Sequence, residues 1–403
     1  MKDFKFEEVI NNKLGRGKKL TISLTSEYSH EAFIQPGQGS FGIGVKGIDS
    51  ERYIDVWVNK DDKIRWESFN RCEILHPERL KDEDEFSGWP RWFHYTGNDI
   101  GFIKWSQKRE IEGFTWCPQR EFSVDFSKSI INELHIHSDY KLHLTFGDNI
   151  EYLDLYGNPN DFIIEKCTKV PSLGFYPKKK ETKGMISLPN IDCFHDAEEL
   201  LVEVDPNGAH FDCNSLLQFP NLKLLHLIGN MTNLSSLKEL KHLNKLGFWN
   251  VPELSDLPTL NNWKELDKFV AMNIDENIGN QLKKELNDLK KQRKFEFASV
   301  TKLRNKLWFE TEYGLPFSNW DSSKEKKATS IYKKCLKDIK AATNEEDIHD
   351  SISEYTSSFN KMKDIETVER EDIYAGLVTI MKNSPIDIKY DVWFNWFDET
   401  RNF

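Results

Sequence analysis

The stretch LKLLHLIGN, from Leu222 to Asn230, decides the fold that the sequence predicts. Apolar residues stand at its first, fourth and sixth positions and an asparagine at its ninth, which gives the pattern L-x-x-L-x-L-x-x-N. Three further stretches follow this pattern with small variations: INELHIHSD (131–139), IEYLDLYGN (150–158) and LNKLGFWN (243–250). Because alternate residues of a β-strand face the same side, each stretch predicts a short strand with one apolar face.

Looser copies of the pattern begin near Val170, Glu199 and Leu266. The copies therefore start at 131, 150, 170, 199, 222, 243 and 266, separated by 19, 20, 29, 23, 21 and 23 residues. In this spacing the region of about residues 125–275 resembles the leucine-rich repeat superfamily, in a short and irregular form. The resemblance implies a solenoid arc of stacked strands, since one copy cannot bury its apolar face alone.

Residues 1–120 contain six of the chain's twelve tryptophans. Their short apolar-alternating runs, separated by turn signals, predict a mostly β domain with an aromatic core. Within this region Gly37, Gly39 and Gly42 have the G-x-G-x-x-G spacing of nucleotide-binding loops. The residues that follow favour a strand rather than a helix, and the companion motifs of a protein kinase are missing from the sequence. We therefore expect no nucleotide cofactor.

From about residue 278 onward the apolar residues have a helical spacing. Ile348, Ile352, Tyr355, Phe359 and Met362 form the clearest stripe, and Thr367 is placed to cap a further helix. The predicted fold class is thus α+β with three domains. They are a Trp-rich, mostly β domain (1–120), a leucine-rich repeat solenoid arc (121–277) and a helical C-terminal domain (278–403).

The composition, with 38% hydrophobic and 30% charged residues, is that of an ordinary globular protein. The sequence shows no apolar run long enough to cross a bilayer, no recognisable signal peptide, and six cysteines without the spacing of a disulfide framework. These features predict a cytoplasmic, bacterial-type protein that does not bind membranes. The formal net charge of −11 disfavours nucleic acid as a ligand and suits a basic protein partner.

In the repeat pattern, the residues between the apolar positions face outward on the concave side of the arc. They are rich in aromatic, histidine and acidic side chains: His135, His137, Asp154, Tyr156, Tyr176, Glu203, Asp205, His226, Lys245 and Trp249. Aromatic residues are enriched at interface centres, and carboxylates beside them suit a partner that offers Lys or Arg. We therefore predict that these residues bind a protein partner. The alternative is an ordinary polar sheet face without a partner.

Two groups contain residue types that bind metal ions. His135 and His137 lie on the same side of one strand, with Asp154 one repeat further on. The second group consists of Cys193, His195, His210 and Cys213. Neither group has a recognised zinc spacing, so we predict no metal site.

Two alternatives to protein recognition stay open. Bacterial effector ubiquitin ligases join leucine-rich repeats to a helical domain with a Cys-x-Asp nucleophile, and this chain is similar in placing Cys335 and Asp338 in its helical part. Cys335 lies on an apolar stripe, however, where a thiol is usually inert. Residues 283–306 carry nine Lys or Arg against three acidic residues and could instead contact nucleic acid.

No catalytic motif stands in its required context, so no catalytic residue is assigned. We predict a non-enzymatic protein that recognises another protein. An immunity protein that neutralises a basic toxin is one class that this acidic chain would suit.

Overall fold

The computed structural model of the chain describes residues 4–6, 10–12, 15–35, 38–50, 54–71, 89–177 and 184–403. It divides into two compact units, Met1–Leu303 and Arg304–Phe403. Among the described residues, no helix has both the length and the apolar character that crossing a bilayer requires.

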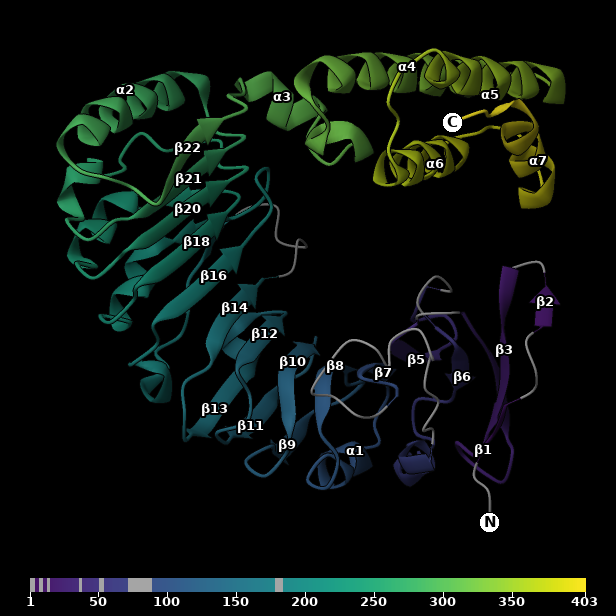
Figure 1. The fold of residues 1–403 in the computed structure, drawn as a ribbon, viewed down its shortest axis with the longest axis horizontal. Coiled ribbons are helices and arrows are strands. Elements are labelled where there is room, and N and C mark those ends of the chain that lie inside the picture. The colour runs from purple at the N-terminus through teal and green to yellow at the C-terminus, as the bar shows by residue number, and fades with distance from the viewer. Residues whose placement is uncertain are drawn as a thin grey trace. The chain divides into compact units, whose positions relative to one another are not determined.

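One parallel sheet of twelve strands dominates the described part of the first unit (Figure 1). From one edge to the other the strands are β6 (Val56–Val58), β5 (Ser40–Val45), β7 (Trp92–Thr96), β8 (Ile111–Cys117), β10 (Ile131–His137), β12 (Tyr152–Tyr156), β14 (Ser172–Tyr176), β16 (Glu199–Glu203), β18 (Leu224–Ile228), β20 (Lys245–Trp249), β21 (Lys268–Met272) and β22 (Phe297–Thr301). Except for β5 and β6, spatial order follows chain order. Each predicted repeat copy contributes one of the seven strands from β10 to β21.

The predicted fold class is wrong. The chain is an α/β protein with one large parallel sheet and a C-terminal helical region, rather than an α+β protein in which a solenoid arc follows a separate β domain. The sheet begins within the Trp-rich region, at β5 and β6, and β8 pairs directly with β10. Ile111, Phe114 and Trp116 of β8 in fact have the same apolar spacing as Leu222, Leu225 and Leu227, with aromatic residues in place of leucine.

The core is continuous along this sheet, because aromatic and aliphatic residues occupy equivalent inward positions. Phe114 and Trp116 on β8, like Leu225 and Leu227 on β18, are fully buried and belong to one cluster. Phe102, from helix α1 (Gly101–Trp105), stacks on Phe114 with ring centroids 4.3 Å apart. Complete burial of each such side chain contributes about 1.5–3 kcal/mol, so many short strands must share one core to be stable.

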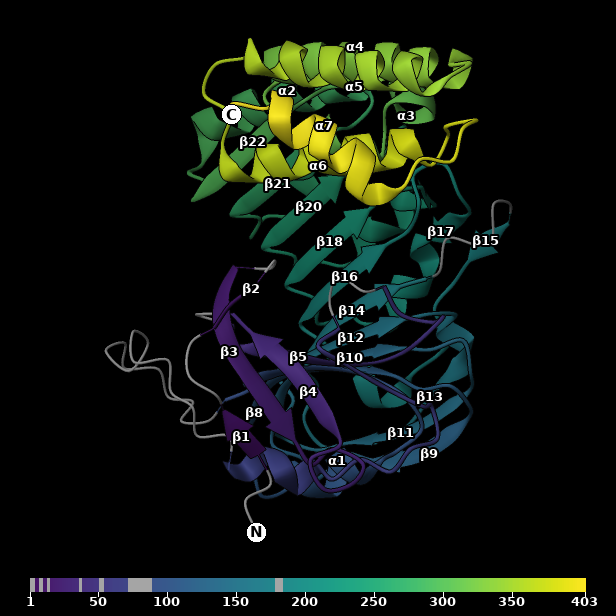
Figure 2. The ribbon, with the colours of Figure 1, turned by 90° about the vertical axis from the view of Figure 1, so that its right-hand side faces the viewer.

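Smaller sheets complete the described part of the first unit. Across the core from β8 to β14 lies a parallel sheet of β9 (Phe122–Asp125), β11 (Leu142–Phe146) and β13 (Phe162–Cys167), which Figure 2 shows as a second layer. A second parallel sheet contains β15 (Met185–Ile186), β17 (His210–Asp212) and β19 (Met231–Thr232). An antiparallel sheet contains β1 (Phe4–Phe6), β2 (Ile10–Asn12), β3 (Gly15–Ile22) and β4 (His30–Ile34).

Helix α2 (Glu276–Gln292) follows β21 and buries Leu282, Leu286 and Leu289 in the same core. Asp275 caps its first turn by accepting hydrogen bonds from the backbone N–H groups of Asn277 and Ile278.

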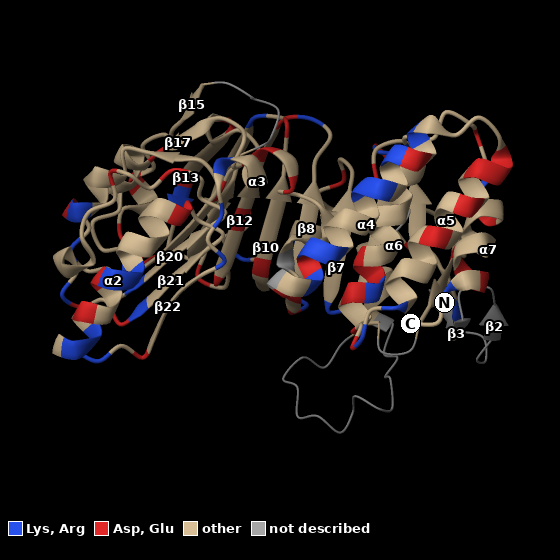
Figure 3. Cartoon of the chain, turned by 90° about the horizontal axis from the view of Figure 1, so that it is seen from above, with Lys and Arg blue, Asp and Glu red and all other residues tan. Residues whose placement is uncertain are grey.

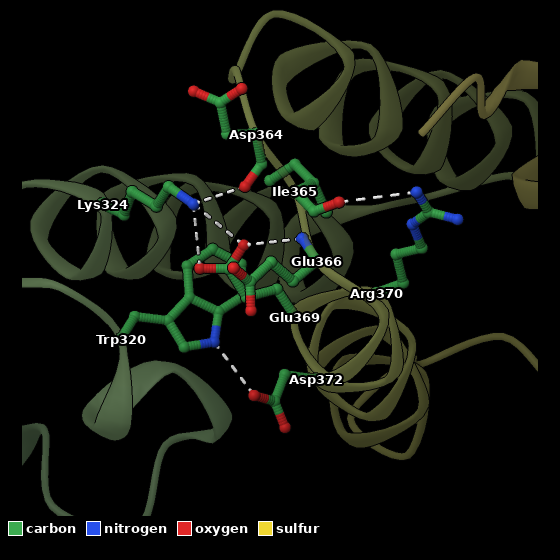
Figure 4. Close-up of polar contacts among 8 residues, drawn as sticks. All are labelled: Trp320, Lys324, Asp364, Ile365, Glu366, Glu369, Arg370 and Asp372. Carbon is green, nitrogen blue, oxygen red and sulfur yellow. Dashed lines mark hydrogen bonds and ion pairs between the residues drawn. The ribbon is translucent and has the colours of Figure 1, made fainter.

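The second unit is helical. Its helices are α3 (Lys306–Thr311), α4 (Ser322–Ala341), α5 (Glu345–Asn360), α6 (Thr367–Met381) and α7 (Tyr390–Thr400). The stripe predicted on 348–362 is buried in its core from Ile348 to Phe359. The predicted cap of α6 is wrong by one residue, since Glu366 precedes the helix and Thr367 is its first residue. Glu369 accepts a hydrogen bond from the Glu366 N–H and pairs with Lys324 of α4 at 3.0 Å (Figure 4).

Candidate protein-binding face of the sheet

Nine of the ten predicted partner-binding residues lie on one side of the twelve-stranded sheet, opposite the core, on strands β10 to β20. The tenth, Asp205, follows the end of β16. We call this side the open face. The nine predicted side chains on it are half-buried, whereas the residues that alternate with them on the same strands are almost all buried. The in-register parallel pairing then aligns outward residues in rows across the strands.

The row at the carboxyl ends of the strands holds a stack of three rings. His137 on β10, Tyr156 on β12 and Tyr176 on β14 occupy equivalent positions of neighbouring strands. The His137 and Tyr156 ring centroids are 3.9 Å apart at 8°, and those of Tyr156 and Tyr176 are 4.1 Å apart at 9°. Burial, followed by the Asp154 charge, raises the pKa of Tyr156 to about 12, and the same causes raise the pKa of Tyr176 well above its ordinary value. Both phenols are therefore neutral at physiological pH.

A pocket of about 290 Å³ adjoins this stack. The three rings line one part of it, and the remaining lining residues are Pro177, Glu203, Val204 and Asp205. The Glu203 carboxylate makes no hydrogen bond or ion pair with any described residue. One oxygen of Asp205 accepts a hydrogen bond from the Asn207 N–H at 2.9 Å, which fixes its orientation. The pocket thus combines flat aromatic surface, apolar walls and two carboxylates.

A second polar group lies on the open face two residues before the ring stack on β10 and β12. His135 Nδ1 is 2.9 Å from Asp154 Oδ2, and His135 Nε2 is 3.9 Å from Glu133 Oε2. On the next strand Gly174 leaves the space that Asp154 occupies, since a Cβ atom there would lie 2.0 Å from Asp154 Oδ1. The Asp154 carboxylate can therefore lie in this position near the tyrosines only because residue 174 is glycine.

A third group lies on β18 and β20. His226 and Trp249 meet edge to face, with ring centroids 4.6 Å apart at 74°. Burial lowers the pKa of His226, an effect that Glu199 opposes and Lys245 reinforces. Lys245 lies at the opposite end of β20 from Trp249, in register with Lys268, so it belongs to a different part of the open face. The structure thus brings together His137 with Tyr156, Tyr176, Glu203 and Asp205, but places the other predicted residues in separate groups.

The sequence reasoning missed Gly174, Gly247, Pro177 and Val204. The two glycines carry a usable signal, since each stands in the segment Leu-Gly-Phe followed by Tyr or Trp. A glycine at an outward position leaves room for a neighbouring aromatic ring to lie against the sheet.

The metal-binding alternatives find no geometric support in the described residues, where no group of three or more His, Cys, Asp or Glu side chains is arranged to hold an ion. His137 stacks on Tyr156, while His135 pairs with Asp154. Cys213 is completely buried, and Cys193 Sγ donates to the backbone carbonyl of Ile164 at 3.6 Å.

Cys335 is 4% exposed, and burial raises the pKa of its thiol to about 12. A thiol of this kind is protonated at neutral pH and is a poor nucleophile. Its Sγ donates to the Ser351 carbonyl of the neighbouring helix at 3.6 Å. The burial and contacts of Cys335 favour a packing role in the helical core over a role as the nucleophile of a ubiquitin-ligase-like enzyme.

The basic residues of 283–306 are interspersed with acidic ones along α2 (Figure 3). Several are engaged within the chain: Lys291 pairs with Asp288 at 2.8 Å, and Lys290 donates to the Ala298 carbonyl at 2.9 Å. Arg293 donates to the Trp263 carbonyl at 2.9 Å. These contacts favour a structural role for the cluster over a nucleic-acid interface.

No family model, no curated protein and no solved structure matches this chain. Membership of the leucine-rich repeat superfamily therefore stays a prediction from the repeat pattern.

Proposed function

We propose that this chain is a non-enzymatic recognition protein that binds a basic protein partner through the open face of strands β10 to β20. The observation that carries the proposal is the stack of His137, Tyr156 and Tyr176 beside the carboxylates of Glu203 and Asp205. Large aromatic side chains with adjacent apolar pockets are the usual anchors of protein interfaces.

The physical chemistry of this face suits binding. Backbone hydrogen bonds hold the paired strands in place, and the stacked rings restrict one another, so ordering these side chains on association costs little conformational entropy. The carboxylates add attraction toward a positively charged partner, which raises the association rate and selects against acidic proteins. An immunity protein directed at a basic toxin is the class of recognition protein that we propose from the charge of the chain.

A photo-crosslinking experiment tests the proposal. The crosslinking amino acid p-benzoylphenylalanine would replace Tyr152, which is 46% exposed on β12 on the open face. In a matched variant it would replace Leu217, which is 39% exposed outside the sheet strands. Both proteins would be illuminated in a lysate of the native source, and the adducts identified by mass spectrometry.

We expect one protein of high isoelectric point to crosslink at position 152 and not at position 217. The adduct should disappear when Tyr156→Ala, His226→Ala and Trp249→Ala are combined with the crosslinker at 152, provided that circular dichroism shows a folded protein. Equal adducts at both positions, or none at position 152, would contradict binding through this face.

A further inference from the structure

The ring stack of the open face ends at Tyr176. Tyr156 has a ring on each side, His137 on β10 and Tyr176 on β14, whereas the next strand, β16, carries no ring at the equivalent position. The pairing of Phe175 with Val202 places Glu203 beside Tyr176 in the same row. One face of the Tyr176 ring contacts Tyr156, and the other face is directed toward Glu203 on β16, where the row has a carboxylate instead of a ring.

The pocket lies where the row of rings ends and the carboxylate of Glu203 follows. It is bounded by the rings together with Pro177 and Val204, and by the carboxylates of Glu203 and Asp205. No Lys or Arg is among these described lining residues, and the Glu203 carboxylate has no polar partner among the described residues. A half-buried carboxylate without a partner gains most from a cation that is brought in from outside.

We propose that this pocket binds the guanidinium group of an arginine side chain from the partner. The planar guanidinium adds a further layer to the stack on Tyr176 and donates hydrogen bonds to Glu203 and Asp205 in its own plane. Pro177 and Val204 contact the aliphatic part of the side chain. The inference rests on the proposed function, and it names the chemical group by which the basic partner is recognised.

Arginine fits this geometry better than lysine. An ammonium is a compact and strongly hydrated charge that does not stack, whereas a guanidinium is flat, weakly hydrated and able to bind carboxylates through two parallel N–H groups. A volume of about 290 Å³ accommodates one such side chain with a few waters.

The test is an NMR titration with three small probes: acetyl-arginine methylamide, its uncharged isostere acetyl-citrulline methylamide, and acetyl-lysine methylamide. Protein labelled with 13C at the tyrosine ε positions would report on the rings, with Tyr156→Phe and Tyr176→Phe assigning their signals. We expect the arginine probe to shift the Tyr176 signal and to bind at least tenfold more tightly than either other probe.

Matched variants locate the interaction. Glu203→Gln should weaken binding of the arginine probe at least tenfold. Glu199→Gln removes the same charge from the same face of β16, four residues away, and should leave the affinity unchanged. Tyr176→Leu should weaken binding to a similar extent as Glu203→Gln. Equal affinities for arginine and citrulline, equal affinities for arginine and lysine, or equal effects of the two glutamine variants would each overturn the proposal.

The two proposals fail separately. Crosslinking of a partner at position 152 together with absent binding of the arginine probe would overturn the arginine pocket alone. Specific binding of the arginine probe together with a partner that crosslinks equally at 217 would retain the pocket and overturn recognition through the open face.

Discussion

The indole ring of Trp249 lies in the space that a side chain at Gly247 would occupy. A Cβ atom at Gly247 would be 2.2 Å from Cζ3 and 2.3 Å from Cη2 of Trp249, and 2.9 Å from Cδ2 of His226. These distances are far below van der Waals contact, so the edge-to-face contact of Trp249 with His226 depends on glycine at position 247.

Gly247→Ala should therefore displace Trp249 and lower the free energy of unfolding by about 1–3 kcal/mol, the usual cost of inserting a methyl group into a packed site. Urea denaturation of Gly247→Ala would measure this loss. Repeating the substitution in a Trp249→Ala background provides the control, because the clash with the indole is then absent, only the 2.9 Å approach to His226 is left, and the cost should be much smaller. An equal cost in both backgrounds would show that Trp249 is not the cause.

This glycine illustrates what the sequence could predict about the open face and what it could not. The period-2 alternation within each strand was enough to assign Tyr156, Tyr176 and Trp249 to the same side of the sheet. That assignment needs only the apolar residues that alternate with them and face the core. Which of these residues meet depends on the register of neighbouring strands. Glu203 lies beside Tyr176 although their repeat copies start 29 residues apart, and the length of the intervening segment does not encode that pairing.

The extent of the sheet was missed for a related reason. Ile111, Phe114 and Trp116 begin a copy of the apolar spacing twenty residues before Ile131, but their aromatic character suggested the core of a separate domain. Shape-compatible aromatic and aliphatic side chains fill equivalent inward positions along one core, as Phe114 and Leu134 do on the paired strands β8 and β10.

Gly229 should tolerate no side chain. Its φ of +96° is unfavourable for other residues, and a Cβ atom would lie 1.9 Å from the carbonyl oxygen of Val204, which is backbone and cannot turn away. Gly229→Ala should lower the free energy of unfolding by about 2–4 kcal/mol, as measured by urea denaturation. Gly47 has a similar φ of +84° but no atom within 4 Å of a Cβ, so Gly47→Ala isolates the cost of backbone strain. Equal losses in the two variants would argue against the predicted clash.

His226 should make the stability of the first unit depend on pH. Burial depresses the pKa of its imidazole in the folded state, so folding favours the neutral ring. The stabilisation is fully present above the unfolded pKa of about 6.5 and is lost as the pH falls below that value toward the folded pKa. His226→Phe retains a ring against Trp249 but does not titrate. It should lose less stability than the wild type between pH 7.5 and pH 5.5 in urea denaturation.

The matched control for this comparison is His242→Phe, which replaces an exposed histidine of the same unit. We expect the wild type and His242→Phe to show the same loss of stability over this pH range. A His226→Phe variant that loses as much stability as the wild type would contradict the prediction.

The ion pair of Lys324 and Glu369 should stabilise the second unit. Lys324 donates to both carboxylate oxygens of Glu369 and to the backbone carbonyl of Asp364. The Lys324 side chain is 24% exposed and the Glu369 side chain 14%. Glu369→Ala leaves the Lys324 ammonium and the Glu366 N–H without this partner, so we expect a loss of about 1–3 kcal/mol in unfolding free energy. The exposed pair of Lys334 and Glu354 is the control, and Glu354→Ala should have little measurable effect. Equal effects of both variants on the denaturation midpoint would contradict a special role for the half-buried pair of Lys324 and Glu369.

Cys335 provides the sharpest test of the enzymatic alternative. A catalytic cysteine must form a thiolate at neutral pH and must be accessible, whereas burial raises the pKa of Cys335 to about 12 and leaves the residue 4% exposed. Iodoacetamide should therefore alkylate Cys335 at pH 7.5 at least 100-fold more slowly in the folded protein than in guanidinium, as followed by peptide mass spectrometry. The unfolded protein is the internal control for the intrinsic reactivity of this peptide. Rapid alkylation of Cys335 in the native state, together with loss of an activity in Cys335→Ser, would favour the ubiquitin-ligase-like alternative over protein recognition alone.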